Sequence, residues 1–383
     1  MRTIGVISVA RSDYGIYLPV LRRIETEPQL QLLLYASGMH LSPEFGLTVG
    51  QIESDGFAIH DRVEMLLSSD NAEGVAKSMG LGTLGFAQSF GRERPDLLLV
   101  LGDRFEMHSA VVAAVAFKIP VAHIHGGELS EGAIDDSLRH SITKLSHLHF
   151  VSNEIHARRV MQMGEEPWRI LVSGAPSLDN LKATKLLTKQ QLEQQFNLKL
   201  EAPFLLVTVH PTTLEPDDTQ QHVHDLLLAL AECGLPTVFT YPNADAQGRM
   251  IIESIKEFSA NRNDCQIVAN LGTQGWFSLM NLAAAMIGNS SSGLLEAPSF
   301  GLPVVNIGSR QRGRLRAQNV IDVGYSRSEI VAGISRAIEP DFRARLAHLV
   351  NPYGDGHAAD RIVKTLRDVQ INDKLLLKRF HDQ

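Results

Sequence analysis

Short apolar runs alternate with amphipathic segments along the whole chain. Ten runs are predominantly apolar at consecutive positions, as is typical of strands buried on both faces of a sheet. They comprise residues 3–9, 32–35, 97–101, 120–124, 149–151, 204–209, 237–240, 266–268, 285–287 and 304–307. Between them, apolar residues recur at helical spacing in segments 17–24, 105–116, 222–231 and 275–284. Strands that alternate with helices in this way predict parallel sheets covered by helices on both faces.

The chain divides into two halves of this kind. It has 383 residues, more than one hydrophobic core usually spans, so two domains are expected. A polar stretch rich in Lys and Gln, residues 182–200, separates the halves. We predict an α/β fold of two Rossmann-like, doubly wound parallel-sheet domains facing a cleft, residues 1–180 and 181–360. The remaining segment, 361–383, is expected to be partly helical and to pack back across the domains.

Composition and charge exclude several classes of protein. Hydrophobic residues make up 44% and charged residues 21%, which is typical of globular proteins and not of disordered ones. The net charge of -7 disfavours nucleic acid and anionic membranes as partners. Cys233 and Cys265 are the only cysteines, so a disulfide scaffold or a CxxC site is excluded. Together with the lack of an apolar run long enough to span a bilayer, this cysteine usage predicts a soluble cytoplasmic protein.

Two further patterns look functional but are better explained otherwise. Residues 80–85 satisfy the Gly-X-Gly-X-X-Gly pattern, but a helical segment precedes them and the strand comes afterwards, the reverse of a dinucleotide site. We therefore expect glycines inside a helix. Five histidines lie between residues 123 and 149, but none forms a zinc-protease spacing with a carboxylate. We predict no metal and no cofactor.

Candidate chemistry in the first half lies in the loops that follow strands, where open parallel sheets bind ligands. Arg11 follows the first strand and suits a phosphate oxygen, while Ser12 or Asp13 beside it can cap the next helix. Asp103 follows the strand 97–101. Its position is compatible with helix capping and with acid–base work.

The loop after strand 120–124 concentrates ionisable groups. His125 and Glu128 flank two glycines, which let the backbone approach another group closely. Asp135 then opens a predicted helix. This density of titratable side chains exceeds what a solvated turn requires and predicts proton transfer.

The second half carries a predicted phosphate site. His210 ends one strand, where a loop histidine with a structural role is the alternative. Residues 288–293, Gly-Asn-Ser-Ser-Ser-Gly, follow another strand and open a predicted helix, an arrangement that suits a diphosphate. Glu296, one turn further, can accept the hydroxyls of a ribose. Four arginines lie within residues 310–316. In a basic protein they would suggest a nucleic-acid site, but because this chain as a whole is acidic, they favour recognition of a phosphate group.

Together these motifs resemble the UDP-N-acetylglucosamine 2-epimerase family, and specifically its hydrolysing, sialic-acid-pathway branch. The resemblance covers nearly the whole chain. It rests on residues 11–15, 102–106, 123–128, 132–140, 210–211, 242–245, 288–296 and 308–314.

The resemblance implies a glycosyltransferase-B-like pair of domains, with UDP held mainly by the second. The UDP-binding residues that it implies are Arg11, Asn243, Ser290, Ser291, Glu296 and Arg310. The catalytic residues expected from it are Asp103, Glu128, Asp135 and His210. At His125 the chain departs from the family, so either His125 takes over a proton-transfer role or Glu128 or Asp135 bears more of it. The partner is then a UDP-sugar, and a homo-oligomer, dimer or tetramer, is expected.

The implied reaction removes the C2 proton of UDP-N-acetylglucosamine and expels UDP, giving 2-acetamidoglucal. Water then adds to give N-acetylmannosamine. Some hydrolysing relatives carry a glutamate where this chain has His125. Because this difference can reflect a different sugar, a 4-acetamido-6-deoxy analogue of UDP-N-acetylglucosamine, used in legionaminic-acid pathways, is an alternative substrate. A glycosyltransferase and a non-catalytic UDP-sugar sensor of the same architecture are further alternatives.

Overall fold

The structure, a computed structural model, describes residues 1–69, 71–129, 134–211, 218–241, 248–260, 262–269 and 271–382. The chain forms two compact units. Unit 1 comprises Met1–Asn180 together with Tyr353–Gln383, and unit 2 comprises Leu181–Pro352. The sequence placed the second boundary at residue 360, eight residues later than the structure does.

Unit 1 is built on a parallel sheet of seven strands in the order β3-β2-β1-β4-β5-β6-β7. The strands are β1 (Arg2–Ser8), β2 (Leu30–Ser37), β3 (Ile59–Val63), β4 (Leu97–Leu101), β5 (Val121–Ile124), β6 (Leu148–Val151) and β7 (Ile170–Val172). Every residue of β4, β5 and β6 is buried, which is the reason that these central strands read as continuous apolar runs.

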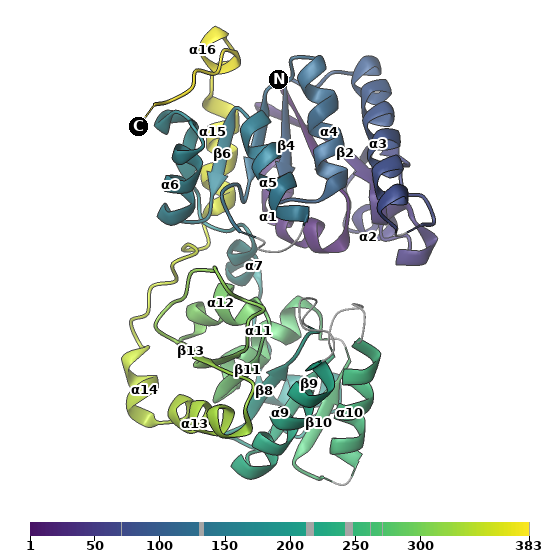
Figure 1. The fold of residues 1–383 in the computed structure, drawn as a ribbon. Coiled ribbons are helices and arrows are strands. Elements are labelled where there is room, and N and C mark those ends of the chain that lie inside the picture. The colour runs from purple at the N-terminus through teal and green to yellow at the C-terminus, as the bar shows by residue number, and fades with distance from the viewer. Residues whose placement is uncertain are drawn as a thin grey trace. The chain divides into compact units, whose positions relative to one another are not determined.

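Helices cover this sheet (Figure 1). They are α1 (Arg11–Glu25), α2 (Val49–Ser54), α3 (Ala72–Arg92), α4 (Phe105–Ala116), α5 (Ile134–Leu145), α6 (Glu154–Gln162), α7 (Ser177–Ala183), α15 (Ala358–Asp368) and α16 (Asp373–Leu376), with 3-10 turns η1 (Gly38–Leu41), η2 (Pro43–Phe45) and η3 (Pro167–Arg169). Helix α4 packs against both α3 and α5, and α1 packs against α15. The predicted glycine-rich helix is confirmed, since residues 80–85 lie inside α3, where Gly82 approaches Met65.

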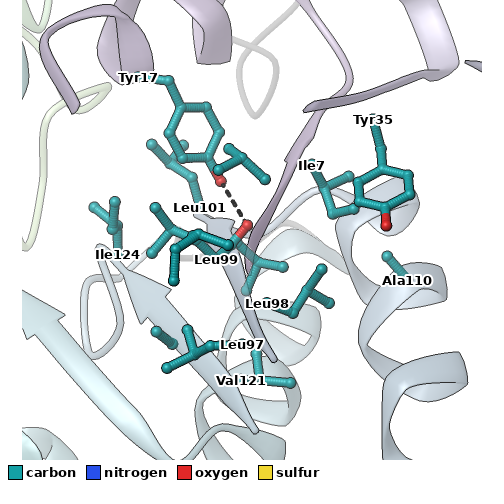
Figure 2. Close-up of a cluster of buried hydrophobic side chains, with 14 of the residues drawn as sticks. Ile7, Tyr17, Tyr35, Leu97, Leu98, Leu99, Leu101, Ala110, Val121 and Ile124 are labelled. Carbon is teal, nitrogen blue, oxygen red and sulfur yellow. Dashed lines mark hydrogen bonds between the residues drawn. The ribbon is translucent and has the colours of Figure 1, made fainter. Parts of the chain in front are cut away.

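The core of unit 1 joins the central strands to the helices (Figure 2). Tyr17 of α1 is fully buried and its hydroxyl donates a hydrogen bond to the carbonyl oxygen of Leu99, 3.4 Å away. That bond satisfies the only polar atom of a large side chain that otherwise packs among apolar ones.

The C-terminal segment belongs to unit 1. Ile362 and Leu366 of α15 are fully buried in the core of this unit. The carboxylate of Asp179 accepts hydrogen bonds from the amides of Ala358 and Ala359 at 3.0 and 2.7 Å, which caps the start of α15. This amphipathic helix completes the first core, which explains why the boundary falls before it.

Unit 2 repeats the architecture with six parallel strands in the order β10-β9-β8-β11-β12-β13. The strands are β8 (Leu205–Thr208), β9 (Thr237–Thr240), β10 (Cys265–Val268), β11 (Ala285–Gly288), β12 (Val304–Ile307) and β13 (Val320–Val323). The helices are α8 (Lys189–Phe196), α9 (Thr219–Cys233), α10 (Gly248–Ala260), α11 (Gly272–Leu282), α12 (Ser292–Leu295), α13 (Arg327–Ala337) and α14 (Pro340–Arg345), with η5 (Ala297–Phe300). Successive strand residues belong to two separate cores: Leu205 and Val207 face one, and Leu206 faces the other.

Both units therefore confirm the predicted α/β class with two parallel sheets. Three strands, β3, β7 and β13, were not predicted. All three lie at sheet edges and are only partly buried. Polar residues interrupt β3 and β13, whereas β7 is a short apolar run of three residues. The first helix was also predicted too short, because α1 begins at Arg11 and not at residue 17.

Candidate functional site

The strand order reverses once in each sheet. Several of the predicted site residues lie in the loops that follow the strands on either side of this reversal. In unit 1 the reversal lies between β1 and β4, and in unit 2 it lies between β8 and β11. Ligands of open parallel sheets bind outside the carboxyl ends of strands at such a reversal. Asp103 follows β4, while His210 and Asn289 follow β8 and β11.

In unit 1, Arg139 of α5 joins the loops after β4 and β5. Its guanidinium donates a hydrogen bond to the Asp103 carboxylate and another to the carbonyl oxygen of His125, at 2.9 Å. The carboxylate of Glu128 lies 3.9 Å from the same guanidinium. Arg139 is buried, so these charges are little screened. Three predicted catalytic residues thus surround one arginine, which the sequence had not singled out.

His125 and Glu128 form a pair of their own. The Nδ1 atom of His125 donates to Glu128 Oε1 at 2.5 Å, and the hydroxyl of Ser152 donates to the same oxygen at 3.0 Å. Burial alone would raise the pKa of the Glu128 carboxyl. The charge and hydrogen bond of His125, with help from Arg139, instead hold that pKa well below its usual value. Glu128 is therefore an anion that orients the imidazole.

This pairing determines which nitrogen of His125 is available. Because Nδ1 carries the proton that Glu128 accepts, the other nitrogen, Nε2, is the basic one in the neutral ring. Nε2 is buried and has no hydrogen-bond partner among the described residues. The backbone of His125 has a φ of 64°, a left-handed conformation that is costly for a residue with a Cβ atom and that clusters at active sites.

Asp135 lies in the first turn of α5, half buried. Burial and the nearby charge of Asp103 raise the pKa of the Asp135 carboxyl above its usual value. A carboxyl in this situation holds a proton to a higher pH than an exposed one and can donate it. The charge of Asp103 thus favours the protonated form of Asp135.

Asp13 is a further buried carboxyl at this edge, considered from the sequence only as a helix cap. The cap position of α1 is Ala10, without a side-chain hydrogen bond, so that expectation is wrong. Asp13 instead lies 4.0 Å from Arg104, and burial raises its pKa to about 7. Arg11, in contrast, is exposed at the start of α1. The motif 11–15 contained the signal, but only the tertiary structure shows that the aspartate faces inward.

In unit 2, Asn289 ties together the loops after β8, β11 and β12. Its side-chain oxygen accepts from the amide of His210 at 2.7 Å and its side-chain nitrogen donates to the His210 carbonyl at 2.9 Å. Its own carbonyl accepts from Arg310 Nη1 at 3.1 Å and from the Gln311 amide at 2.8 Å. Burial, reinforced by Arg310, lowers the pKa of His210 to about 4, so this imidazole is neutral at pH 7.

The serine loop follows Gly288, whose position admits only glycine. Its φ is 132°, and a Cβ atom there would lie 1.9 Å from the carbonyl oxygen of Thr208. The loop opens a helix as predicted, but α12 covers only Ser292–Leu295, and a 3-10 turn containing Pro298 follows. One turn carries little of a helix dipole. Any diphosphate here would depend mainly on the hydroxyls and amides of Ser290 and Ser291.

Glu296 follows α12 directly rather than lying inside a helix. Burial raises the pKa of its carboxyl, and the Oε2 atom has no hydrogen-bond partner among the described residues. An unpaired buried carboxyl oxygen is suited to accept a ligand hydroxyl.

The arginines of residues 310–316 have different surroundings. Arg316 is paired with Asp322 at 2.6 Å, and Arg312 is exposed. Arg310 contacts the Asn289 loop, as described above. Asn243, which the sequence placed at the UDP site, lies outside the described residues.

The described part of the chain offers neither a metal site nor a membrane span. Within those ranges, no group of three or more His, Cys, Asp or Glu side chains has a geometry that could hold a metal ion. The buried histidines there have protein partners: His123 donates to the Gly102 carbonyl at 2.7 Å, and His149 pairs with Glu165 at 3.0 Å. Likewise, no helix among the described residues has the length and apolarity that a membrane span requires.

Comparison with known proteins gives a family. Residues 22–367 match the family model described as UDP-N-acetylglucosamine 2-epimerase. The chain belongs to this family. A Campylobacter jejuni protein named GDP/UDP-N,N'-diacetylbacillosamine 2-epimerase (hydrolyzing) is 39% identical over 384 residues, covering 100% of this chain and 99% of the relative.

A second relative, from Legionella pneumophila, is named UDP-N,N'-diacetylbacillosamine 2-epimerase (hydrolyzing). It is 35% identical over 378 residues, covering 99% of each chain. The epimerase is therefore an enzyme of the hydrolysing branch, as the resemblance predicted. Both relatives are named for a diacetylbacillosamine sugar.

The fold agrees with solved structures of the family. The crystal structure of UDP-GlcNAc 2-epimerase from Neisseria meningitidis, bound to UDP-GlcNAc, has a TM-score of 0.80 at 18% sequence identity and covers 96% of this chain and 99% of that one. At this identity the similarity establishes the glycosyltransferase-B-like fold of the epimerase.

Proposed function

We propose that this epimerase hydrolyses UDP-N,N'-diacetylbacillosamine, releasing UDP and the free sugar inverted at C2. N,N'-diacetylbacillosamine is a 2,4-diacetamido-2,4,6-trideoxy sugar, the alternative substrate that the sequence raised. The observation that carries the chemistry is the cluster around Arg139, where Asp103 and the His125–Glu128 pair meet. The names of the two relatives with 39% and 35% identity support the sugar and move UDP-N-acetylglucosamine to second place.

The first step requires a base at C2, because no carbonyl group acidifies that proton. The Nε2 atom of His125 is the basic nitrogen, and Glu128 stabilises the imidazolium that forms when it takes the proton. The C1–O bond then breaks, the electron pair leaves with UDP, and a C1–C2 double bond remains. The His125–Glu128 pair thereby supplies the base for this step.

The second step adds water to this double bond. A hydroxyl group bonds to C1 and a proton is delivered to C2 from the opposite face, which inverts that carbon. Asp103 and Asp135 are the proposed proton-handling groups. The raised pKa of Asp135 lets it hold and donate a proton, and Arg139 positions the Asp103 carboxylate beside the His125–Glu128 pair.

UDP must leave as a stabilised anion. In unit 2, Ser290, Ser291 and Arg310 offer hydroxyls and a positive charge to the diphosphate, and Glu296 offers an acceptor to the ribose. Arg11 of unit 1 and Asn243 complete the proposed set of UDP ligands. His210, held neutral beside Arg310, is proposed as a contact to the leaving diphosphate and not as its proton donor.

Product analysis by NMR in deuterated water tests the function. The protein is incubated with UDP-N,N'-diacetylbacillosamine and, separately, with UDP-N-acetylglucosamine. We expect equal amounts of UDP and of the free 2-epimer carrying deuterium at C2. Accumulation of an intact UDP-linked 2-epimer would contradict hydrolysis, and a requirement for an acceptor would indicate a glycosyltransferase. Binding without turnover would indicate a sensor.

A further inference from the structure

A pocket in unit 1 adjoins the carboxyl cluster but contains none of the residues assigned to the C2 chemistry. Its volume is about 480 Å³, within the range of small-molecule sites. Four segments form it: the η1–η2 region, the residues between β3 and α3, the first turns of α3, and the start of α4 with the preceding Arg104. The lining side chains are those of Met39, Ser42, Glu44, Phe45, Leu66, Leu67, Ser68, Ser69, Val75, Ser78, Arg104, Phe105 and Glu106.

The pocket has an unsatisfied polar floor. The side chain of Glu106 is fully buried, and its Oε1 atom accepts from Arg104 Nη2 at 3.3 Å. The other oxygen, Oε2, has no hydrogen-bond partner among the described residues. A buried carboxylate oxygen left unpaired is costly and is normally satisfied by a partner. Arg104 also lies 4.0 Å from Asp13, so the floor is continuous with the candidate active site.

The lining of the pocket is mixed: seven of the thirteen side chains are polar or charged, and six are apolar. Leu66, Val75 and Phe105 contribute partly buried side chains. At the rim, Phe45 is 45% and Leu67 41% exposed. Large apolar side chains clustered at the mouth of a cavity favour an apolar ligand group over water. The pocket therefore suits a group with an N–H donor next to a methyl group.

We infer that this pocket binds the 4-acetamido and 6-methyl groups of the sugar. The inference rests on the proposed function and names the structural origin of its substrate. Asp103 directly precedes Arg104 in the chain, so a sugar whose C2 lies at Asp103 has its remaining ring carbons within reach of the pocket. C4 lies across the ring from C1, the carbon that carries UDP. The amide N–H of the 4-acetamido group donates to Glu106 Oε2, and the two methyl groups contact Leu66, Val75 and Phe105.

This arrangement predicts substrate discrimination. UDP-N-acetylglucosamine has hydroxyls at C4 and C6 and cannot fill the apolar part of the lining. A single methylene in an apolar pocket changes kcat/KM by about tenfold or more. We therefore expect kcat/KM for UDP-N,N'-diacetylbacillosamine to exceed that for UDP-N-acetylglucosamine by at least about tenfold.

The test measures kcat/KM for both nucleotide sugars in four variants with exposed side chains. Leu67→Trp fills the mouth of the pocket, and its control is Leu84→Trp, an exposed leucine of α3 outside the pocket. Phe45→Ala removes a wall, and its control is Leu47→Ala, exposed two residues further along. Both pocket variants are expected to lower the preference for the diacetamido sugar by about tenfold, and both controls to keep it.

The outcomes separate the subsite from the function. If the wild-type protein releases UDP from both sugars but neither pocket variant changes their ratio, the subsite is refuted and the hydrolysing function stands. A ratio that falls equally in the controls also refutes the subsite. If the wild-type protein hydrolyses neither sugar, the proposed function falls, and the inference falls with it. Melting temperatures of all four variants identify any loss of folding.

Discussion

Replacing Glu128 by glutamine tests the role of the His125–Glu128 pair. The substitution keeps the size and the hydrogen-bonding shape of the side chain but removes its charge. The amide oxygen can still accept from His125 Nδ1. What is lost is the anion 2.5 Å from that nitrogen, which stabilises the imidazolium formed when Nε2 takes a proton from the substrate.

The magnitude follows from the geometry. The two side chains are 11% and 19% exposed, so an effective dielectric constant of about 20 applies. At this value two unit charges about 4 Å apart attract by about 4 kcal/mol. Losing that attraction in the transition state lowers kcat by about a thousandfold, which is within the usual range for general acid–base catalysis.

The assay is the release of UDP and free sugar from whichever nucleotide sugar the wild-type protein hydrolyses, with UDP affinity measured by calorimetry. Glu165→Gln is the matched control, because Glu165 also pairs with a histidine, His149, at 3.0 Å. His149 lies within β6 and not in a loop at the carboxyl end of a strand. We expect the control to lower the melting temperature, since Glu165 is buried and also contacts Lys144, and to keep kcat within a few fold.

Two results would refute this reasoning. If Glu128→Gln retains kcat within threefold of the wild-type value, the pair does not act in proton transfer. If Glu165→Gln loses as much activity as Glu128→Gln, the loss reflects weakened structure in unit 1. Unchanged UDP affinity is expected in Glu128→Gln, because Glu128 is not among the proposed UDP ligands.

Four further outcomes are expected. Asp103→Asn should abolish turnover with little change in UDP affinity, and calorimetry showing strongly weakened UDP binding would contradict a role in the chemistry. The double variant Ser290→Ala, Ser291→Ala should weaken UDP binding at least about tenfold, through lost hydrogen bonds to a charged group; unchanged binding by calorimetry would exclude this loop. The Asp13 carboxyl, with its pKa raised to about 7, binds a proton in the folded chain that it loses near pH 4 when unfolded, so stability falls as the pH rises between these values. Asp13→Asn should therefore show a smaller drop in melting temperature from pH 5 to pH 8 than the wild-type protein, and an equal drop would assign the pH dependence to other groups. Gly288→Ala should prevent correct folding of unit 2, because the new Cβ atom would lie 1.9 Å from a backbone oxygen; a wild-type circular dichroism melt would refute this.

Much of the fold was determined by local pattern. Strands buried on both faces must be apolar at consecutive positions, so the central strands of both sheets could be found from the sequence, and the α/β class followed. Edge strands have one side without a neighbour and tolerate polar residues, which is why β3 and β13 carried no comparable signal. The return of α15 to unit 1 depends on which core its apolar face completes, and no local pattern encodes that choice.

The site shows the same division. Because parallel strands end at one edge, sequence alone could assign Asp103, His125 and Glu128 to loops at that edge. It could not show that Arg139, from a helix, joins them, or that Asp13 faces inward to Arg104. Those facts depend on side-chain directions and on contacts between segments about 15 to 90 residues apart. The residue types that perform the chemistry could thus be identified from the sequence. Tertiary packing determined their pairing, their protonation and the pocket beside them, because burial and distance set the energies of charges.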